Sequence, residues 1–505
     1  MRLTRRAFLS ATTALALTGP VSATGAVEMF SPDDVVAMAR ALAERPFRLR
    51  KQVPEDWRNL SYEQYRKLWF RPTEALWFQS DAPYEVDFFA PGLYFPRPIK
   101  VYEVSEGQAT AVPFDLSKFD RTDKFPDVTL DDSLGYSGLR LRTELTEPGK
   151  KNEFCVFQGA SYFRAIGHDM IYGLSARGLA LKTGDPAGEE FPEFTHFWLE
   201  RPAPGQNNIV IHALMDSLSV TGAYRFDIAP GPECVMDVTA EIFARERLTH
   251  VGIGPLTSMF LFDETVPTRF DDFRPAVHDS DGLLVWNGAG ERLWRPLANP
   301  RTLQISAFGD NNPRGFGLMQ RARKFSDFND LEALYHRRPG LWVEPKGDWG
   351  EGSVSLVEIP ADQEIYDNIV AYWRPRKPMA AGDNRKLEYR LTWGTKAPVE
   401  QTVAEVIGTA MGARHAWANP PQGRMAFIDF APHPAFEDGP DAIDIFVSSP
   451  HVDTTPGILQ RNPETGGMRL AFSFDPKERE MVELRAQLRK DGVAVSEVWL
   501  YRWTA

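Results

Sequence analysis

The chain has 505 residues and a formal net charge of −12, with 43% hydrophobic and 25% charged residues. This composition is typical of a globular protein with a sizeable core, so it excludes a disordered chain. The excess of acidic residues repels phosphate backbones and argues against nucleic acid as a partner. A chain of this length exceeds what one hydrophobic core usually organises, and we therefore expect two domains.

The first residues have the pattern of an export signal. Arg5 and Arg6 precede Phe8 and Leu9, as in a twin-arginine motif, and a short apolar run and small residues suited to signal peptidase follow. The apolar run is too short to span a bilayer. We predict a cleaved signal peptide at residues 1–26, export by the twin-arginine route and a mature periplasmic protein. The alternative is a Sec signal with a chance arginine pair.

Two short helices are predicted next. Ser31 provides an N-cap and Pro32 a first-turn proline ahead of an amphipathic run. Ser61 and Gln64 have the spacing of a capping box at the start of the second helix. The apolar side of this second helix would consist of Tyr65, Leu68 and Trp69.

The rest of the chain has the pattern of strands. Residues 82–373 consist of short apolar or alternating runs separated by Pro, Gly, Asp and Asn, which predicts a large β-sandwich. Residues 374–386 contain two prolines, a basic cluster and a glycine without apolar periodicity, so they are the predicted linker. The predicted organisation is a β-sandwich at 27–373, the linker, and an immunoglobulin-like sandwich at 387–505.

Cys155 and Cys234 are the two cysteines of the chain. In an oxidising compartment they could form a disulfide, but a large core does not need such a link. A disulfide and a pair of buried thiols are therefore both open interpretations.

Several common chemistries lack their motifs. The sequence contains no P-loop, no Gly-x-Ser-x-Gly elbow and no His-Glu-x-x-His. The run from Asp279 to Gly282 differs from a calcium loop, because its glycine comes at the fourth position and its twelfth position is Gly290. We therefore predict neither a metal nor a cofactor.

Acidic residues in aromatic and glycine-rich surroundings offer a different chemistry. Glycoside cleavage needs one carboxyl group to protonate the leaving oxygen and a second to activate water or attack the sugar. The densest candidates are Asp279, within residues 277–283, and Asp367, within residues 364–373. Asp367 precedes an apolar strand, where partial burial would raise its pKa toward that of a useful acid. The alternative for either residue is a turn or capping role.

Longer motifs indicate a family. The segment 157–180 combines glycines, aromatic residues and two arginines in no regular period. Further motifs lie at residues 190–202, 277–297, 312–321, 342–347 and 357–373. Together they resemble the signature of the periplasmic glucan biosynthesis proteins G and D. The motifs occur in family order, whereas the C-terminal part matches only in size and strand pattern.

The resemblance implies an all-β fold, in which a large N-terminal β-sandwich of the galactose-mutarotase-like supersandwich type carries a glucan groove and a small immunoglobulin-like sandwich follows. It also implies an inverting glucanase or transglycosylase that acts on β-1,2-glucan. Asp367 would be the general acid, and Asp279 the base that reaches its water through a relay of hydroxyls. Tyr366 departs from the small polar residue that we expect before the acid, so its ring would alter the acid's solvation or the neighbouring subsite.

The residues expected to contact the glucan are Tyr162, Arg164, Arg177, Trp198, Glu364, Tyr366 and Trp373. Arginine forks can hold vicinal hydroxyls and aromatic faces can stack on sugars. The alternative is that the arginines pin loops to backbone carbonyls and the tryptophans fill the core.

The sequence therefore leaves two functions from different classes open. The first is a glucan-processing enzyme, with hydrolysis and transfer both open. The second is a non-catalytic glucan-binding factor that guides nascent β-glucan from an inner-membrane synthase. The choice between the G and D proteins, and between a monomer and a homodimer, is also open. Turnover and the two aspartates separate the two functions.

Overall fold

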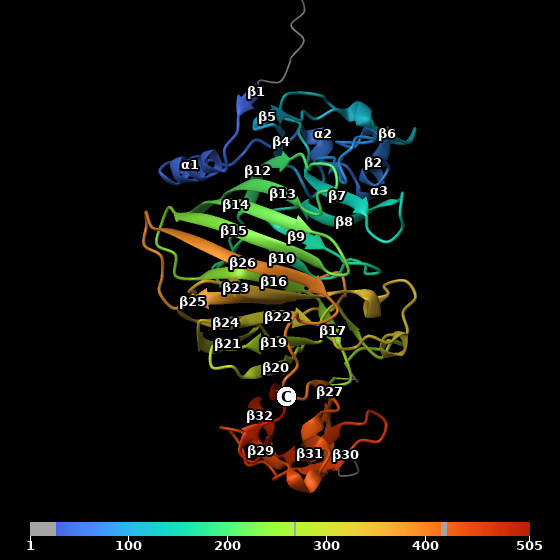
Figure 1. Ribbon diagram of the computed structural model, residues 1–505, viewed down its shortest axis with the longest axis vertical. Coiled ribbons are helices and arrows are strands. Elements are labelled where there is room, and N and C mark those ends of the chain that lie inside the picture. The colour runs from blue at the N-terminus through green and yellow to red at the C-terminus, as the bar shows by residue number, and fades with distance from the viewer. Residues whose placement is uncertain (1–26, 267–268, 416–421) are drawn as a thin grey trace, which may run out of the picture.

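The computed structural model describes residues 27–266, 269–415 and 422–505 (Figure 1). The predicted signal peptide at residues 1–26 lies outside this range. The described chain is built mainly of strands, so the predicted all-β class is confirmed. A large unit occupies most of the long axis, and a smaller unit lies at its end (Figure 1). Among the described helices, none is long and apolar enough to cross a membrane.

The longer of the two main sheets runs through both units. Its order is β1 (Val27–Met29), β5 (Gln108–Ala111), β4 (Lys100–Ser105), β12 (Glu193–Glu200), β13 (Ile209–Asp216), β14 (Val220–Ala229), β15 (Cys234–Ala244), β26 (Asn384–Gly394), β23 (Gly340–Lys346), β22 (Gly315–Met319), β19 (Gly282–Trp286), β20 (Arg292–Pro296), β34 (Val498–Thr504), β32 (Met481–Lys490) and β29 (Asp444–Ser448), with β33 (Val493–Ala494) beside β32. The passage between the units is the parallel pairing of β20 with β34.

The second main sheet packs against the first. Its order is β21 (Gln304–Asn311), β24 (Glu351–Glu358), β25 (Ile369–Pro375), β16 (Val251–Ser258), β10 (Ser175–Arg177), β9 (Tyr162–Ala165), β8 (Lys151–Gln158), β7 (Gly138–Glu144) and β3 (Glu85–Phe89), with β11 (Ala180–Leu181) beside β16. Phe163 of this sheet contacts Phe226 and Trp393 of the longer sheet, at ring-centroid distances of 5.2 and 6.0 Å. These side chains belong to one buried apolar cluster, so the two sheets form a sandwich.

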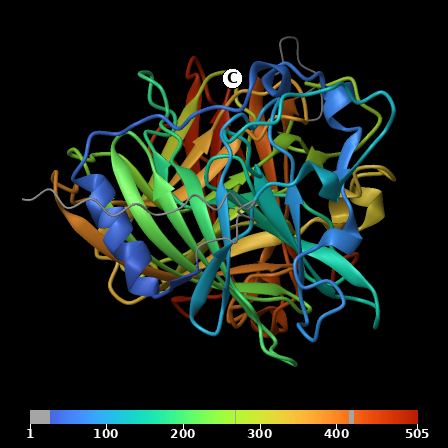
Figure 2. The ribbon, with the colours of Figure 1, turned by 90° about the horizontal axis from the view of Figure 1, so that it is seen from above.

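The helices lie outside this sandwich. They are α1 (Pro32–Ala43), α2 (Glu55–Arg58), α3 (Tyr62–Tyr65) and the 3-10 turns Pro72–Glu74, Leu116–Lys118, Phe325–Asp327, Tyr335–Arg337, Pro434–Phe436 and Pro440–Ala442. Helix α1 crosses the outer face of the longer sheet (Figure 2), where Val35 and Ala39 are buried against Trp198 and Leu214. The predicted start of α1 is confirmed, because Ser31 accepts a hydrogen bond from the Asp33 amide.

The second predicted helix is shorter than its apolar pattern indicated. The capping box of Ser61 and Gln64 is present, but α3 ends at Tyr65. Leu68 and Trp69 instead belong to strand β2 (Leu68–Phe70), which pairs with β6 (Phe119–Arg121). The helix prediction for Leu68 and Trp69 was wrong because a single helical turn has little stability of its own, and pairing of this segment with the distant strand β6 is more stable than a longer helix.

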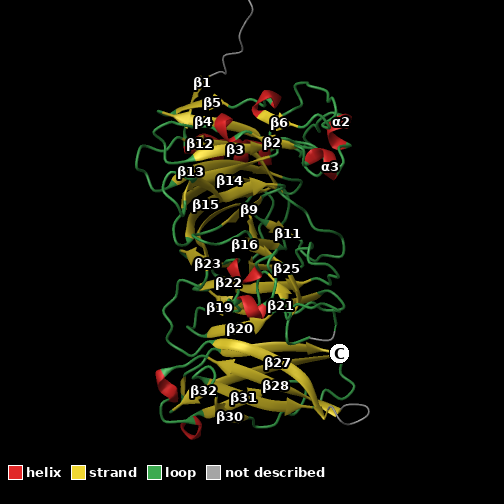
Figure 3. Ribbon diagram, turned by 90° about the vertical axis from the view of Figure 1, so that its right-hand side faces the viewer, coloured by secondary structure: helices red, strands yellow, loops and turns green. Residues whose placement is uncertain are grey.

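The small unit contains a sheet in the order β27 (Val406–His415), β28 (Gln422–Phe430), β31 (Met468–Phe474) and β30 (Ile458–Arg461), visible at the lower end of Figure 3. It packs against the end of the longer sheet around Phe472 and Trp499, whose ring centroids are 5.9 Å apart. The likeness to an immunoglobulin domain, like that of the large unit to a galactose-mutarotase supersandwich, stays a prediction.

Strand β26 (Asn384–Gly394) bears on the predicted linker at residues 374–386. The linker range contains the end of β25 and the start of β26, and β26 lies between β15 and β23 inside the longer sheet. Residues 387–394 therefore belong to the large unit by their hydrogen bonds. We propose that the division between the units lies after Gly394 rather than at 374–386.

Both cysteines are buried free thiols of the large unit. Burial raises the pKa of the Cys155 thiol well above its usual range, and it raises the pKa of Cys234 to about 12. Both therefore act as small apolar side chains of the core.

Candidate active site

Asp279 lies on the short connection between β18 (Val277–His278) and β19. Its amide donates a hydrogen bond of 2.8 Å to the carbonyl of Met259, which fixes the backbone there. Its side chain is only 5% exposed and forms a charge-assisted hydrogen bond with Arg338. Arg338 in turn donates to the carbonyl of Ala333 through Nε and Nη2, at 3.3 and 3.1 Å. Asp279 is thus a buried carboxyl group in one fixed position.

Opposing influences act on the protonation of Asp279. Burial raises the pKa of this carboxyl group, and the negative charge of Asp367 raises it further. The positive charges of Arg338 and Arg164 act in the opposite direction and favour the ionised form. Burial has the larger effect, so the pKa of Asp279 lies above its usual range, and Arg338 limits this rise.

Asp367 stands in a more open environment, immediately before Asn368 and strand β25. Its side chain is 34% exposed, and the Nη2 atom of Arg164 lies 3.7 Å from its Oδ2 atom. Its neighbour Asn368 is buried and donates to the carbonyls of Phe260 and Ile359, at 2.9 and 3.0 Å. The Asn368 side chain also accepts a hydrogen bond of 2.8 Å from the Phe260 amide. The backbone that carries Asp367 is therefore held in place although its carboxyl group meets solvent.

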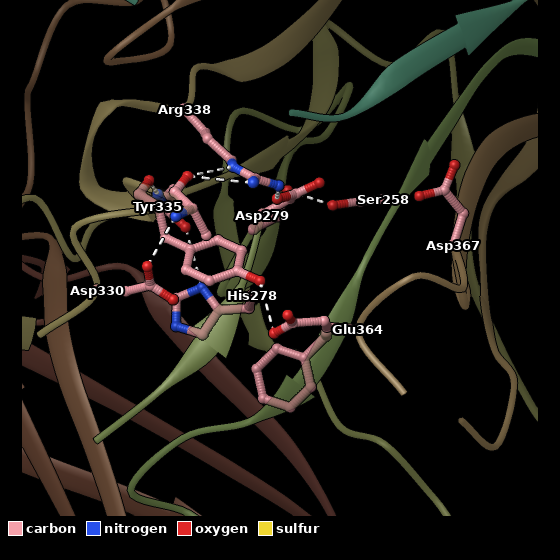
Figure 4. A network of polar contacts seen from close by, with 12 residues as sticks. Ser258, His278, Asp279, Asp330, Tyr335, Arg338, Glu364 and Asp367 are labelled. Carbon is pink, nitrogen blue, oxygen red and sulfur yellow. Dashed lines mark hydrogen bonds and ion pairs between the residues drawn. The ribbon is translucent and has the colours of Figure 1, made fainter. Parts of the chain in front are cut away.

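The fold brings the two aspartates together from positions far apart in the chain. Phe260, which Asn368 holds, pairs with His278, the residue before Asp279. Ser258 pairs across the sheet with Ile369 and shares a hydrogen bond of 2.8 Å with the hydroxyl of Ser280. Figure 4 shows Ser258 between the two carboxyl groups. Strand pairing thus sets their relative position, with serine hydroxyls beside them.

Adjoining hollows extend from this acid pair. One of about 570 Å³ is lined by Asp367, Arg164, Tyr162 and Phe95 among others. A second shares Phe95 and Tyr162 with it and continues past Tyr94, whose side chain is 73% exposed. These hollows form an open path with aromatic and charged walls. Such walls suit a polyhydroxylated chain, because rings cover the C–H faces of sugars and charged groups bind hydroxyls.

A third hollow lies on the Arg338 side of the pair. Its walls include Phe273, Arg338 and Glu364, and Phe273 is 81% exposed. Glu364 accepts a hydrogen bond of 3.0 Å from the Tyr335 hydroxyl, seen in Figure 4, and forms an ion pair of 2.8 Å with Arg274. One hollow thus lies on the Asp367 side of the acid pair and another on the Arg338 side.

The three hollows described above are together called the groove from here on. Some of the predicted glucan contacts lie in it. Tyr162, Arg164 and Glu364 line the hollows. Tyr366, next to Asp367, is 52% exposed and free to meet a ligand. Arg177 is buried behind Tyr162, where it donates to Thr257 and Glu189 and lies 4.8 Å from the Tyr162 ring centroid. Arg177 therefore positions Tyr162 rather than presenting its own fork to the groove.

Two predicted tryptophans lie elsewhere. Trp198 is buried on the outer face of the longer sheet, under helix α1, with Phe30 and Tyr102 stacked near it. Trp373 is buried between the two sheets and packs near Trp349. Period-two alternation identifies such residues as strand residues but leaves open which face is covered, and here neighbouring elements cover both rings.

Sequence reasoning missed the groups that hold the acids in place. Arg338, Tyr335 and Asn368 are close partners of the site, yet only Asn368 lies within one of the family motifs, the one at residues 357–373. The signal for Arg338 is a basic run before a proline and a glycine, which by itself says nothing of a carboxylate partner. Over the described ranges, no three His, Cys, Asp or Glu residues gather as metal ligands would.

Fold and site together define the class: an all-β protein with open, aromatic-walled hollows beside two carboxyl groups in unequal environments. The family model for "Periplasmic glucan biosynthesis protein, MdoG" matches residues 30–503. The chain belongs to this family.

Individual relatives agree with the family match. The chain is 47% identical over 481 residues to "Glucans biosynthesis protein G" of Vibrio cholerae serotype O1, covering 94% of this chain and 87% of the relative. It is 48% identical to the protein of the same name from Shewanella frigidimarina, over 94% of this chain and 85% of that one. The protein of Shewanella sp. (strain MR-4) is 45% identical, with 94% and 87% covered. The predicted resemblance is therefore confirmed, and a role in glucan biosynthesis follows from the family.

Proposed function

We propose that this protein is a periplasmic enzyme that cleaves or rearranges β-1,2-glucan with inversion. The observation that carries the proposal is the unequal pair of carboxyl groups. Asp279 is buried and bound by Arg338, whereas Asp367 is partly exposed on the wall of the groove. A glycosidase needs this division between one residue that stays ionised and another that delivers a proton.

We propose a separate role for each carboxyl group. Asp367, at the open wall, would protonate the oxygen of the departing sugar. Asp279, whose ionised form Arg338 stabilises against the effect of burial, would accept a proton from water that attacks the anomeric carbon from the opposite face. The hydroxyls of Ser258 and Ser280, 2.8 Å apart, offer a relay for that proton. In transfer, a sugar hydroxyl would take the place of the water.

The decisive test is turnover by the mature protein. Purified protein incubated with linear β-1,2-glucan should yield shorter or rearranged chains. Chromatography of samples taken over time would detect these products. Proton NMR during the first minutes should show the α-anomer at new reducing ends, because inversion of a β-bond produces it. Initial β-anomer would overturn the inverting mechanism. Intact glucan after prolonged incubation, with binding retained, would overturn catalysis.

The names of the relatives are also compatible with a second function, that of a non-catalytic glucan-binding factor. They speak of glucan biosynthesis, and a non-catalytic factor that guides nascent glucan from a membrane synthase would also need the groove. The aspartates separate the two functions. A binding factor should support glucan production in cells when Asp279→Asn or Asp367→Asn replaces the wild type, whereas an enzyme should not.

We also propose export by the twin-arginine route. The support is the Arg5-Arg6 pair with Phe8 and Leu9, together with the periplasmic description of the family. Replacing both arginines by lysine should leave precursor in the cytoplasm. Normal yield of periplasmic protein from this variant would contradict the route.

A further inference from the structure

The segment of residues 319–323 begins at the last residue of strand β22, and its first four residues are hydrogen-bonded to residues close to Asp279 in the chain. The Asp281 amide donates to the carbonyl of Met319 at 2.9 Å. The Oδ2 atom of Asp281 accepts from the amides of Arg321 and Ala322, at 2.8 and 3.0 Å. The connection that carries Asp279 is thus hydrogen-bonded to the 319–323 segment in both directions.

The same segment also holds the residues around Arg338. Gln320 shares a hydrogen bond of 2.9 Å with His278 and donates to the carbonyl of Tyr335. Arg323 donates through Nη1 to the carbonyl of Arg338, the residue whose side chain binds Asp279. One five-residue segment is therefore bonded both to the connection that carries Asp279 and to the backbone of Tyr335 and Arg338.

The other side of the segment is attached to the small unit. The two terminal nitrogens of Arg321 donate to the two carboxylate oxygens of buried Glu497, at 2.8 and 2.7 Å, and its guanidinium lies 3.5 Å from the Trp294 ring centroid. The same Glu497 accepts from the amide of Val406, at the start of the small unit's sheet. Bidentate arginine–carboxylate pairs fix orientation as well as distance.

Arg323 supplies a second attachment. Its Nη2 atom donates at 3.2 Å to the carbonyl of Thr395, in the connection from β26 to β27 that leads into the small unit. Its guanidinium therefore joins that connection to the backbone of Arg338. A hollow lined by His278, Asp281 and Arg323 lies beside these contacts, so packing does not fill the space and the polar contacts are needed to hold the geometry.

We propose that the small unit positions the catalytic base: through Arg321 and Arg323 it holds the 319–323 segment, and this segment holds Asp279 against Arg338. Arg321 and Arg323 are positioning residues, since neither touches the groove hollows described above. This inference rests on the proposed function where it concerns turnover. Its mechanical part, the attachment of the Asp279 connection to the small unit, does not depend on catalysis.

The test compares Arg323→Met with Arg461→Met. Arg461 is a matched control because it also donates to backbone carbonyls, those of Phe436 and Glu437, but within the small unit. Arg323→Met should lower kcat on β-1,2-glucan by roughly 10- to 100-fold with KM within about twofold, because small displacements of a catalytic group are costly while the groove is intact. Arg461→Met should leave both constants unchanged. An unchanged kcat in Arg323→Met, or an equal fall in Arg461→Met, would overturn the proposal.

Hydrogen exchange of the Asp281 amide provides a readout besides activity. The Arg323→Met protein should exchange this amide faster than the wild type, and Arg461→Met should not. Unchanged exchange would overturn the positioning role whatever the kinetics. If wild-type protein showed no turnover while exchange rose as expected, the proposed function would fail and the mechanical attachment would stand. Glu497→Gln is the second variant, and it should reproduce both effects if it folds.

Discussion

The two aspartate connections of the groove carry the same side chain and behave differently. The Asp279 connection is hydrogen-bonded to the 319–323 segment, and the buried carboxyl group of Asp279 forms an ion pair with Arg338. The Asp367 connection is held at its backbone through Asn368, and its carboxyl group meets solvent and lies 3.7 Å from the partly exposed Arg164 side chain. The difference teaches that one fold can give two aspartates unequal environments, and the roles of acid and base that we propose for them depend on that difference.

Removing either carboxylate tests this division most severely. Asp367→Asn and Asp279→Asn should each lower kcat by roughly 10²–10⁴, because each loses one proton transfer while shape and glucan binding persist. A substrate with a better leaving group should recover part of the rate for Asp367→Asn, since the leaving oxygen then needs less help, but none for Asp279→Asn. Equal recovery in both variants would erase the distinction between acid and base.

The arginine beside the buried carboxyl group should control the pH dependence. If Asp279 acts ionised, activity rises with pH through its pKa, and Arg338 lowers that pKa against the effect of burial. Arg338→Met should therefore move the acidic limb of the kcat/KM profile to higher pH, by about 1–3 units, the usual effect of a close opposite charge. Arg338→Lys keeps the charge and should move it less. A shift to lower pH would contradict the assignment of Asp279 as base.

Asn368, which holds the backbone beside the exposed carboxyl group of Asp367, is the next residue to change. Asn368→Ala should lower the free energy of unfolding by about 1–3 kcal/mol for each buried backbone group left without a partner. It should also lower kcat roughly tenfold as Asp367 loses its fixed position. Urea unfolding and steady-state kinetics measure the two effects. Asn462 is the control in the small unit, where its side chain donates to Asp429 at 3.0 Å and accepts from the Glu464 amide at 3.1 Å. Asn462→Ala should affect stability alone, and a fall of kcat in this control would show a global cause.

The smallest effect is expected at Tyr366. Its side chain is 52% exposed, so Tyr366→Ser should change the free energy of unfolding by no more than about 0.5 kcal/mol. Because the ring borders Asp367, we expect a change of less than tenfold in KM and an altered ratio of hydrolysis to transfer, as measured from the products. An unaltered product pattern would show that the tyrosine takes no part in the subsite.

The sequence by itself determined the features that depend on neighbouring residues. Ser31 and Ser61 cap helices at the predicted places because a cap is made within one turn. Alternating apolar residues predicted strands, and the motifs around Asp279 and Asp367 predicted the family. The same motifs contain the two aspartates that strand pairing brings near each other.

Only the tertiary structure decided what depends on pairing over long separations. Strand β26 has the alternating pattern of any half-buried strand, and its place between β15 and β23 follows from hydrogen bonds with segments far away in the chain. Trp198 alternates like a surface strand residue, yet helix α1 covers it. Arg338 meets Asp279 across 59 residues of chain because Asp279 precedes β19 and Arg338 precedes β23, and both strands pair with β22.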